Sequence, residues 1–359
     1  MIKFLDLQKL NQPFEAQFLA KTKLFLDKGW YVLGEEVQQF EQSFAKFSNA
    51  KHCIGVGNGL DALVLILKAY IQLGNLQKGD EVIVPANTYI ATVLAILQAD
   101  LVPVFVEPNI ETYNINPDLI SEKITSKTKA IVLVHLYGQL AEMDKIMELG
   151  NQHNLIIIED AAQAHGLTFK GNHARAFSFY PGKNLGALGD GGAITTDDEQ
   201  LAEVLFSLRN YGSNKKYHND YIGINSRLDE LQAAFLNIKL PYLHTENKAR
   251  QKVAKRYIEE IKNQKVVLPT CDKFKNHVFH LFVIRTENRD DLQKYLFSNG
   301  IETIIHYPIP PHQQKALSDL NQLSFPITEK IHHEVLSLPI SSVLTDEEIT
   351  HIIATLNHY

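Results

Sequence analysis

Residues 155–166 read Leu155-Ile156-Ile157-Ile158-Glu159-Asp160-Ala161-Ala162-Gln163-Ala164-His165-Gly166. A run of apolar residues without alternation is typical of a strand buried on both faces, as in a parallel sheet. A carboxylate at the tip of such a strand is costly to bury unless a cation meets it. Asp160 is therefore a candidate for binding a cationic group. The alternative is that Asp160 caps the N-terminus of a helix formed by the residues after it.

The same pattern recurs over residues 1–240. Apolar runs predict strands at 54–56, 81–85, 102–106, 130–134, 155–159 and 176–179. Periodic apolar positions predict helices at 36–47, 60–73, 92–98 and 143–153. Strands that alternate with helices indicate an α/β fold, with a mostly parallel sheet covered by helices on both faces. Ligands bind at the carboxyl ends of strands in such sheets. The candidate positions there are Gly57–Gly59, Tyr89, His135, Asp160 and Lys183.

The pattern changes after Pro241. The sequence predicts a long charged helix at 248–262, a strand at 277–286, a helix at 289–298 and a strand at 301–306. Thr345 precedes three acidic residues, which is typical of a helix N-terminus and predicts a final helix at 345–356. We therefore expect a large domain over residues 1–240, which carries the candidate site, and a smaller α+β domain over residues 241–359.

Composition narrows the class of function. The 359 residues are 45% hydrophobic and 21% charged, and the net charge of −6 without a basic cluster argues against nucleic acid as a partner. Cys53 and Cys271 are far apart, which favours a reducing cytoplasm over a disulfide framework. Charges interrupt the first ten residues, so we expect no signal peptide, and no apolar run approaches the ~20 residues of a membrane span. The histidines lack the spacing of metal ligands, so no metal site is expected.

One lysine lies in an unusual setting, in the stretch Ser178-Phe179-Tyr180-Pro181-Gly182-Lys183-Asn184-Leu185-Gly186. Pro181 and Gly182 end the preceding strand sharply and place Lys183 at its tip. Partial burial would lower the pKa of the Lys183 amine, and a neutral amine can condense with a carbonyl group. The alternative is an ordinary surface lysine in a loop rich in glycine and proline.

Lys183 and Asp160 together favour a pyridoxal-phosphate site. A carboxylate beside the pyridine nitrogen keeps that nitrogen protonated, which makes the ring an electron sink. Gly57-Asn58-Gly59, between a strand and a helix, offers backbone amides for the phosphate, and Ser178 adds a hydroxyl. Tyr89 could stack on the ring, although most such tyrosines pack in a core. A dinucleotide site is disfavoured, because the third glycine and the acidic residue ~20 positions further on are missing.

Six motifs follow one another along the chain: Gly-Asn-Gly (57–59), Thr-Tyr-Ile-Ala-Thr (88–92), His-Leu-Tyr-Gly-Gln (135–139), Glu-Asp-Ala-Ala-Gln-Ala (159–164), Ser-Phe-Tyr-Pro-Gly-Lys-Asn-Leu (178–185) and Gly-Ile-Asn-Ser-Arg-Leu-Asp-Glu-Leu-Gln-Ala-Ala (223–234). In this order they resemble the motifs of the DegT-type nucleotide-sugar aminotransferases, which are fold-type-I pyridoxal-phosphate enzymes. The resemblance runs from about Phe4 to beyond Pro311, nearly the whole chain.

The resemblance implies a role for each matching residue. Lys183 would attach the cofactor covalently, Asp160 would pair with its pyridine nitrogen, and Gln163 would lie near its ring hydroxyl. Tyr89 would stack on the ring. The phosphate would be held by Gly57, Asn58, Gly59 and Ser178, joined by Asn225 from the second subunit of a homodimer with shared active sites.

The resemblance also implies the substrates. L-glutamate would donate the amino group, a nucleotide-linked keto sugar would accept it, and His306, Tyr307 and Tyr217 would line the sugar pocket. The lysine stretch is most similar to that of members that aminate carbon 3 of a dTDP-3-keto-6-deoxyhexose. Amination at carbon 4, or of a UDP-linked 3-keto sugar, remains the alternative. A dehydratase of the family would carry histidine in place of Lys183, and a regulatory protein would not need the complete catalytic set.

One departure from the family concerns the link between Gly171 and Phe177. Only five residues separate these two positions, fewer than is usual in the family. The cofactor motifs on both sides are intact, so we expect the chemistry to be kept. The shape of the pocket, the local stability and the dimer contacts at this point could differ.

Overall fold

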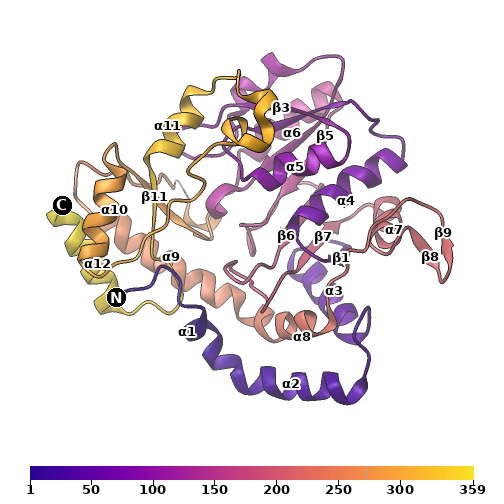
Figure 1. Cartoon of the computed structure of the whole chain (residues 1–359), viewed down its shortest axis with the longest axis horizontal. Coiled ribbons are helices and arrows are strands. Elements are labelled where there is room, and N and C mark those ends of the chain that lie inside the picture. The colour runs from indigo at the N-terminus through magenta and orange to yellow at the C-terminus, as the bar shows by residue number, and fades with distance from the viewer. Residues whose placement is uncertain (272) are drawn as a thin grey trace.

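A seven-stranded sheet forms the centre of the computed structural model, which describes residues 1–271 and 273–359 (Figure 1). The strand order is β1-β7-β6-β5-β4-β2-β3. The strands are β1 (His52–Val56), β2 (Glu81–Pro85), β3 (Val102–Val106), β4 (Thr128–Val134), β5 (Ile156–Asp160), β6 (Ala174–Ser178) and β7 (Gly192–Thr196). β7 pairs antiparallel with both of its neighbours, and the other pairs are parallel. The predicted fold, an α/β fold with a mostly parallel sheet, is confirmed.

Helices cover both faces of this sheet, so that neighbouring residues of one strand enter different cores. Ile158 of β5 packs in the core shared with α4, α5 and α7, whereas Ile157 faces the core shared with α6. On the neighbouring strand β6, Phe177 packs against α3 and α8. The bounds of these helices are α3 (Glu35–Phe47), α4 (Gly59–Gln72), α5 (Ile90–Gln98), α6 (Met143–His153), α7 (Glu199–Leu208) and α8 (Glu230–Lys239). Burial on both faces explains why the strands are continuously apolar.

Two N-terminal helices, α1 (Leu7–Asn11) and α2 (Glu15–Lys28), were not among the predicted elements. α2 lies along the outside of the molecule (Figure 1) and buries only Phe18, whose ring centroid is 4.8 Å from that of Phe235 in α8. A helix with so little buried surface has weak apolar periodicity, which is the signal on which the sequence prediction depends.

The part of the chain predicted to form a second domain contains α9 (Leu243–Glu260), α10 (Arg289–Ser298), α11 (Pro326–Glu334), α12 (Asp346–His358) and the antiparallel pair β10 (Phe282–Arg285) and β11 (Val335–Leu338). The final helix was predicted correctly, and Thr345 forms a capping box with Glu348. The strand expected at 301–306 is wrong, because Ile301 and Ile304 make only isolated bridges, to Ile2 and Ser337. The partner of Ile301 comes from the other end of the chain.

The N-terminal residues pack against this second domain. Ile2 lies in its core, and its backbone bonds Gly300 and Glu302 at 2.7 and 2.9 Å. Figure 1 accordingly shows the N-terminus beside α12. The predicted division at residues 240 and 241 places this segment in the large domain, although its contacts are with the small one.

A hairpin and short 3-10 helices complete the described chain. The hairpin is β8 (Ser213–Lys215) with β9 (His218–Asn219). The 3-10 helices lie at Gln12–Phe14, Pro117–Leu119, Ser121–Lys123, Leu136–Gly138, Leu240–Tyr242, Phe274–Asn276, Pro311–Gln313 and Lys315–Leu320. Within the described ranges, none of the helices combines the length and the apolar character that crossing a membrane requires.

Arg175 of β6 bonds the turn that precedes its own strand. Its guanidinium Nη2 donates to the carbonyl of Gly171 at 2.6 Å, and its Nε lies 2.9 Å from the Glu159 carboxylate. Glu159 is fully buried and also accepts a hydrogen bond from Nε2 of His135 at 2.8 Å. His135 therefore serves this structural network on β4, β5 and β6. Three of the five residues between Gly171 and Phe177 lie in β6, and Arg175 bonds the turn before them.

Candidate active site

Asp160 ends β5 with a buried carboxylate that hydrogen bonds hold in place. Thr92 Oγ1 donates to Oδ2 at 2.9 Å, and the amide of Ala162 donates to Oδ1 at 3.1 Å. Burial raises the pKa of this carboxyl, and the bonds from Ala162 and Thr92 and the charge of Lys183 oppose that rise. Residues 161–166 form turns and no helix follows, so the helix-cap alternative is wrong.

Lys183 lies at the end of a tight turn after β6. Its amide donates to the carbonyl of Tyr180 at 2.8 Å. Further along the turn, a Cβ added to Gly186 would lie 2.3 Å from the carbonyl oxygen of Pro181, so only glycine fits there. Burial lowers the pKa of the Lys183 amine to about 8, against the opposing charge of Asp160. This agrees with the lowered pKa that the sequence predicted.

Three histidines surround this amine, and each is held neutral. Burial lowers the pKa of His165 to about 3 and that of His306 to about 4, and it lowers the pKa of His280 well below its usual value. In each case the positive charge of Lys183 lowers the pKa further. The amine therefore has one charged neighbour, Asp160, among the described groups that shift its pKa.

Gln163 joins two tyrosines on the same side of the site. Its Oε1 accepts from the amide of Tyr137 at 2.5 Å, and its Nε2 donates to the hydroxyl of Tyr307 at 2.8 Å. The Tyr307 ring lies 5.0 Å from that of Tyr89, tilted by 31°. Tyr137 and Tyr307 have φ angles of 59° and 60°. The bond to Gln163 and the ring contact with Tyr89 place Tyr307 in one cluster with these residues. Positive φ angles in large residues such as Tyr137 and Tyr307 are typical of functional sites.

The predicted phosphate site lies where the end of β1 meets the N-terminus of α4. Asn58 caps α4 by accepting from the amide of Asp61 at 2.8 Å, and the amides at the very start of the helix have no intrahelical partner. A Cβ on Gly59 would lie 2.8 Å from Cβ of Ser178, which places the hydroxyl of Ser178 at this helix end. Ser226 bonds the amide of Gly57 at 2.9 Å. The arrangement suits an anion.

These residues fit pyridoxal phosphate on two independent grounds. The Asp160 carboxylate is buried and its pKa is raised, and a protonated ring nitrogen beside it would offset the free-energy cost of burying its charge. The glycine-lined helix N-terminus beside Ser178 provides a seat for the phosphate. Tyr89 keeps 52% of its surface exposed, so that one face remains free for stacking.

Two predicted site residues are exposed in the single chain, although one of them, Asn225, directly precedes Ser226 at the phosphate site. Asn225 is exposed and forms an isolated bridge with Asn210. Tyr217 is 87% exposed in the β8–β9 hairpin, which projects at the far end of the molecule from α10 and α12 (Figure 1). Nζ of Lys216 lies 5.2 Å from the Tyr217 ring.

Several residues at the site were not predicted. Thr92 and Ser226 lie within motifs already quoted, so the motifs contained a signal for them. Asn184 and His280 are bonded to each other beside Lys183, and nothing in the local sequence of His280 indicates this position. Their contact depends on how the second domain packs against the first.

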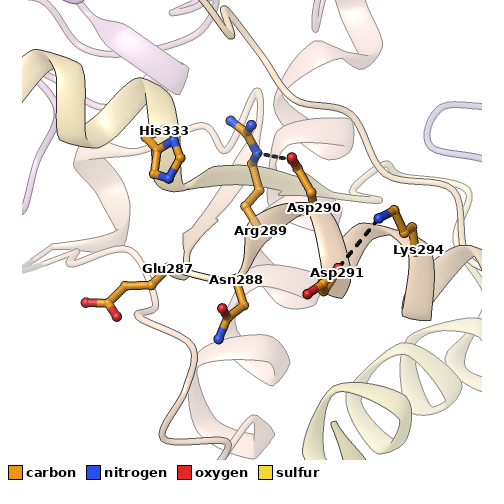
Figure 2. Close-up of a pocket in the computed structure, with 7 residues that line it drawn as sticks. All are labelled: Glu287, Asn288, Arg289, Asp290, Asp291, Lys294 and His333. Atoms are coloured by element: carbon orange, nitrogen blue, oxygen red, sulfur yellow. Dashed lines mark hydrogen bonds and ion pairs between the residues drawn. The ribbon is translucent and has the colours of Figure 1, made fainter.

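A pocket at the start of α10 lies outside this site (Figure 2). It is lined by Glu287, Asn288, Arg289, Asp290, Asp291, Lys294 and His333. Figure 2 shows that Arg289 pairs with Asp290 and Lys294 with Asp291, at 2.8 and 3.5 Å. Its charges are thus partly neutralised within the pocket. Across residues 1–271 and 273–359, no group of three or more side chains is arranged to hold a metal ion.

Comparisons with known proteins agree with this geometry. The model of the DegT/DnrJ/EryC1/StrS aminotransferase family matches residues 13–357. A dTDP-3-amino-3,6-dideoxy-alpha-D-galactopyranose transaminase of Aneurinibacillus thermoaerophilus is 55% identical over 100% of this chain and 99% of its own length. A dTDP-3-amino-3,4,6-trideoxy-alpha-D-glucose transaminase of Streptomyces venezuelae is 42% identical over 100% and 96%.

A solved structure shows the same likeness in three dimensions. The crystal structure of S. venezuelae DesV in complex with a ketimine intermediate is 42% identical and superposes with a TM-score of 0.95, over 99% of this chain and 98% of that one. The family match covers nearly the whole chain and includes every motif at the site. This chain therefore belongs to the DegT/DnrJ/EryC1/StrS aminotransferase family.

Proposed function

We propose that this protein transfers the amino group of an amino acid, L-glutamate, to carbon 3 of a dTDP-linked 3-keto-6-deoxyhexose, with pyridoxal 5'-phosphate as cofactor. The observation that carries the proposal is the Lys183 amine, with a pKa near 8, in the field of the buried Asp160 carboxylate. The sugar specificity is supported by the names of the two similar transaminases, both of which act on dTDP-3-amino sugars.

Each residue of the cluster has a distinct task in this reaction. When bound, the cofactor supplies an electron sink for the bonding electrons at the donor's α-carbon. Asp160 would hold a proton at the ring nitrogen of the bound cofactor, and Thr92 and the amide of Ala162 hold the carboxylate in place. The Lys183 amine takes the proton from the donor's α-carbon, and later delivers a proton to carbon 3 of the sugar. A pKa near 8 leaves part of the amine neutral at neutral pH.

The binding residues divide between cofactor and sugar. Gly57–Gly59 and Ser178 would hold the phosphate, and Tyr89 would cover one face of the ring. His306 and Tyr307 would face the sugar, and the bond from Gln163 to Tyr307 orients the phenol. Donor and sugar use the same site in turn. The donor leaves as 2-oxoglutarate before the keto sugar enters.

We also propose a homodimer in which Asn225 and the Lys216–Tyr217 pair serve the neighbouring subunit's site. Both Asn225 and Tyr217 are exposed in the single chain. Large apolar side chains of α2 and the loop after it are exposed as well, Leu24, Leu26 and Trp30 at 52%, 62% and 66%. Exposed apolar patches of this kind are typical of protein interfaces. A cytoplasmic location, which the dispersed cysteines favour, is part of the same proposal.

Product analysis tests the function directly. The purified protein is incubated with pyridoxal phosphate, L-glutamate and, separately, a dTDP-3-keto sugar, a dTDP-4-keto sugar and a UDP-3-keto sugar. We expect an amine on carbon 3 of the first substrate, identified by NMR, and none with the Lys183→Ala variant. Amination of the 4-keto sugar alone would refute carbon 3, and preference for the UDP sugar would refute the dTDP assignment. A regulatory role is not favoured, because the catalytic residues are complete.

A further inference from the structure

Asn184, the residue after Lys183, uses its whole side chain to bond other parts of the molecule. Its Nδ2 donates to Oδ1 of Asn247 at 2.8 Å and to the carbonyl of Val278 at 3.2 Å. Its Oδ1 lies 3.1 Å from Nδ1 of His280. The Val278 carbonyl can only accept, so Nδ2 is the donor and Oδ1 must accept from His280. The side chain is 5% exposed, and its amide is fully satisfied.

Asn247 extends this connection from α9 to the loop that follows Asp160. Its Nδ2 donates to the carbonyl of His165 at 2.8 Å, and the residue is 5% exposed. A Cβ on Gly166 would lie 2.6 Å from that Nδ2, and Gly166 has a φ of 90°, so only glycine lets Asn247 reach this carbonyl. The loops that carry Lys183 and Asp160 are thus joined through two side-chain amides.

Residues of the second domain take part in the same hydrogen-bond network. Val278 and His280 lie in the segment that leads into β10. The Val278 side chain packs in the core of α3 and α8, whereas β10 itself packs in the core of the small domain. Asn184 therefore makes three bonds to residues after Pro241, one to Asn247 of α9 and two to Val278 and His280 before β10. A displacement of the small domain would therefore shift Asn184, the residue next to Lys183.

We propose that Asn184 is a positioning residue. Together with Asn247 it fixes the position of Lys183 relative to Asp160, and it makes the Lys183–Asp160 distance depend on the position of the small domain. The inference rests on the proposed function only in taking Lys183 as the reacting amine. The three bonds act on the backbone of a tight turn, and a shift of ~1 Å in a reacting group is enough to change its rate.

The charges around the amine predict the direction of the effect. The titratable groups facing Lys183 are Asp160 on β5, His165 in the loop after it, His280 before β10, and His306. Arg250 of α9 faces His280. Burial is the main cause of the lowered pKa of Lys183, so a loosened turn that admits water raises that pKa.

The test uses Asn184→Ala, which removes all three bonds, and Asn247→Ala, which leaves the Asn184 side chain in place. Asn263→Ala is the matched control: Asn263 follows α9 and donates to the carbonyl of Leu356 at 2.7 Å, away from the site. All three variants are expected to lose some thermal stability, as any lost buried hydrogen bond causes. Only Asn184→Ala and Asn247→Ala should change the pKa of Lys183 and the rate of the half-reaction.

The readouts separate positioning from general destabilisation. Competitive acetylation followed by mass spectrometry gives the pKa of Lys183 in cofactor-free protein, and we expect it to rise by about one unit in both Asn184→Ala and Asn247→Ala. In the loaded enzyme, the rate of the half-reaction with L-glutamate should fall about tenfold, with the KM for glutamate changed less than about threefold. The double variant should be less impaired than additivity predicts.

The proposal is overturned if Asn247→Ala, folded and no less stable than Asn263→Ala, keeps the pKa of Lys183 and the half-reaction rate of the parent. If Asn184→Ala does not fold, Asn247→Ala alone decides. The acetylation measurement needs no sugar, so a wrong sugar assignment would leave its result unchanged. Failure of every variant and of the parent to use any amino donor would instead refute the proposed function.

Discussion

At the scale of single residues, the proposed chemistry relies on groups that the fold holds in unfavourable states. Lys183 loses hydration and has a pKa near 8, and the buried Asp160 carboxyl has a raised pKa. Two tyrosines at the site, Tyr137 and Tyr307, have left-handed backbone angles. Each feature costs stability, and in each case the surrounding structure keeps the residue in place.

Replacing Lys183 by methionine should abolish transamination and stabilise the cofactor-free protein at pH 7. The folded-state pKa is lowered from the usual lysine value of 10.5 to about 8, so folding is penalised wherever the unfolded chain would be protonated. That penalty is full below pH 8 and disappears as the pH rises towards 10.5. Thermal unfolding of both proteins across this range measures it. A gain in melting temperature that does not shrink between pH 8 and 10.5 would contradict the stated cause.

At the scale of elements, three neighbouring strands are joined beneath the site by the buried network of His135, Glu159 and Arg175. Nδ1 of His135 accepts from the amide of Ala141 at 3.2 Å, so Nε2 carries the proton that Glu159 accepts. The histidine is therefore neutral, and Arg175 balances the charge of Glu159. This network keeps β5 in register with β4 and β6, and Asp160 is the next residue along β5.

Arg175→Met should therefore destabilise the protein by about 3–5 kcal/mol, since it leaves a buried carboxylate without its cation. The double variant Glu159→Gln with Arg175→Met should recover much of that loss, because no buried charge remains. Urea unfolding measures both. The exposed pair Lys23–Asp27, at 2.9 Å, supplies the control, and Lys23→Met should cost less than about 1 kcal/mol. Equal losses in Arg175→Met and Lys23→Met would show that Glu159 does not depend on Arg175.

At the scale of the whole molecule, the site combines residues from distant parts of the chain. Asp160 and Lys183 come from the large domain, whereas Val278, His280 and Tyr307 come from the small one. The proposed dimer would add Asn225 and Tyr217 of a second copy. Such a shared site would account for the exposure of these two residues in the single chain.

Mixing two inactive variants tests this shared site. Lys183→Ala and Asn225→Ala subunits are mixed in equal amounts and allowed to exchange, so that about half of the dimers are mixed. Each mixed dimer has one complete site and one site that lacks both residues, so about a quarter of all sites would be active. The measurement is transaminase activity before and after mixing, with each variant alone as the control. Absence of recovery, with exchange verified and Asn225→Ala inactive by itself, would place Asn225 outside the neighbour's site.

The order of the motifs was sufficient to predict the family, and the apolar runs were sufficient to predict the α/β class, because each motif and each run consists of residues close together in sequence. The assignment of Asp160 and Lys183 as the catalytic pair remains a prediction. The runs of apolar residues indicate strands buried on both faces, and Pro181 and Gly182 indicate the turn before Lys183. The tertiary structure decided the rest. It rejected the helix cap at Asp160 and the strand at 301–306, and it placed Tyr307 against Gln163 and Tyr89. It also brought His280 to Asn184, 96 positions apart in sequence. Contacts of this kind depend on the packing of one domain on the other. The periodicity of apolar residues within a single segment contains no information about that packing.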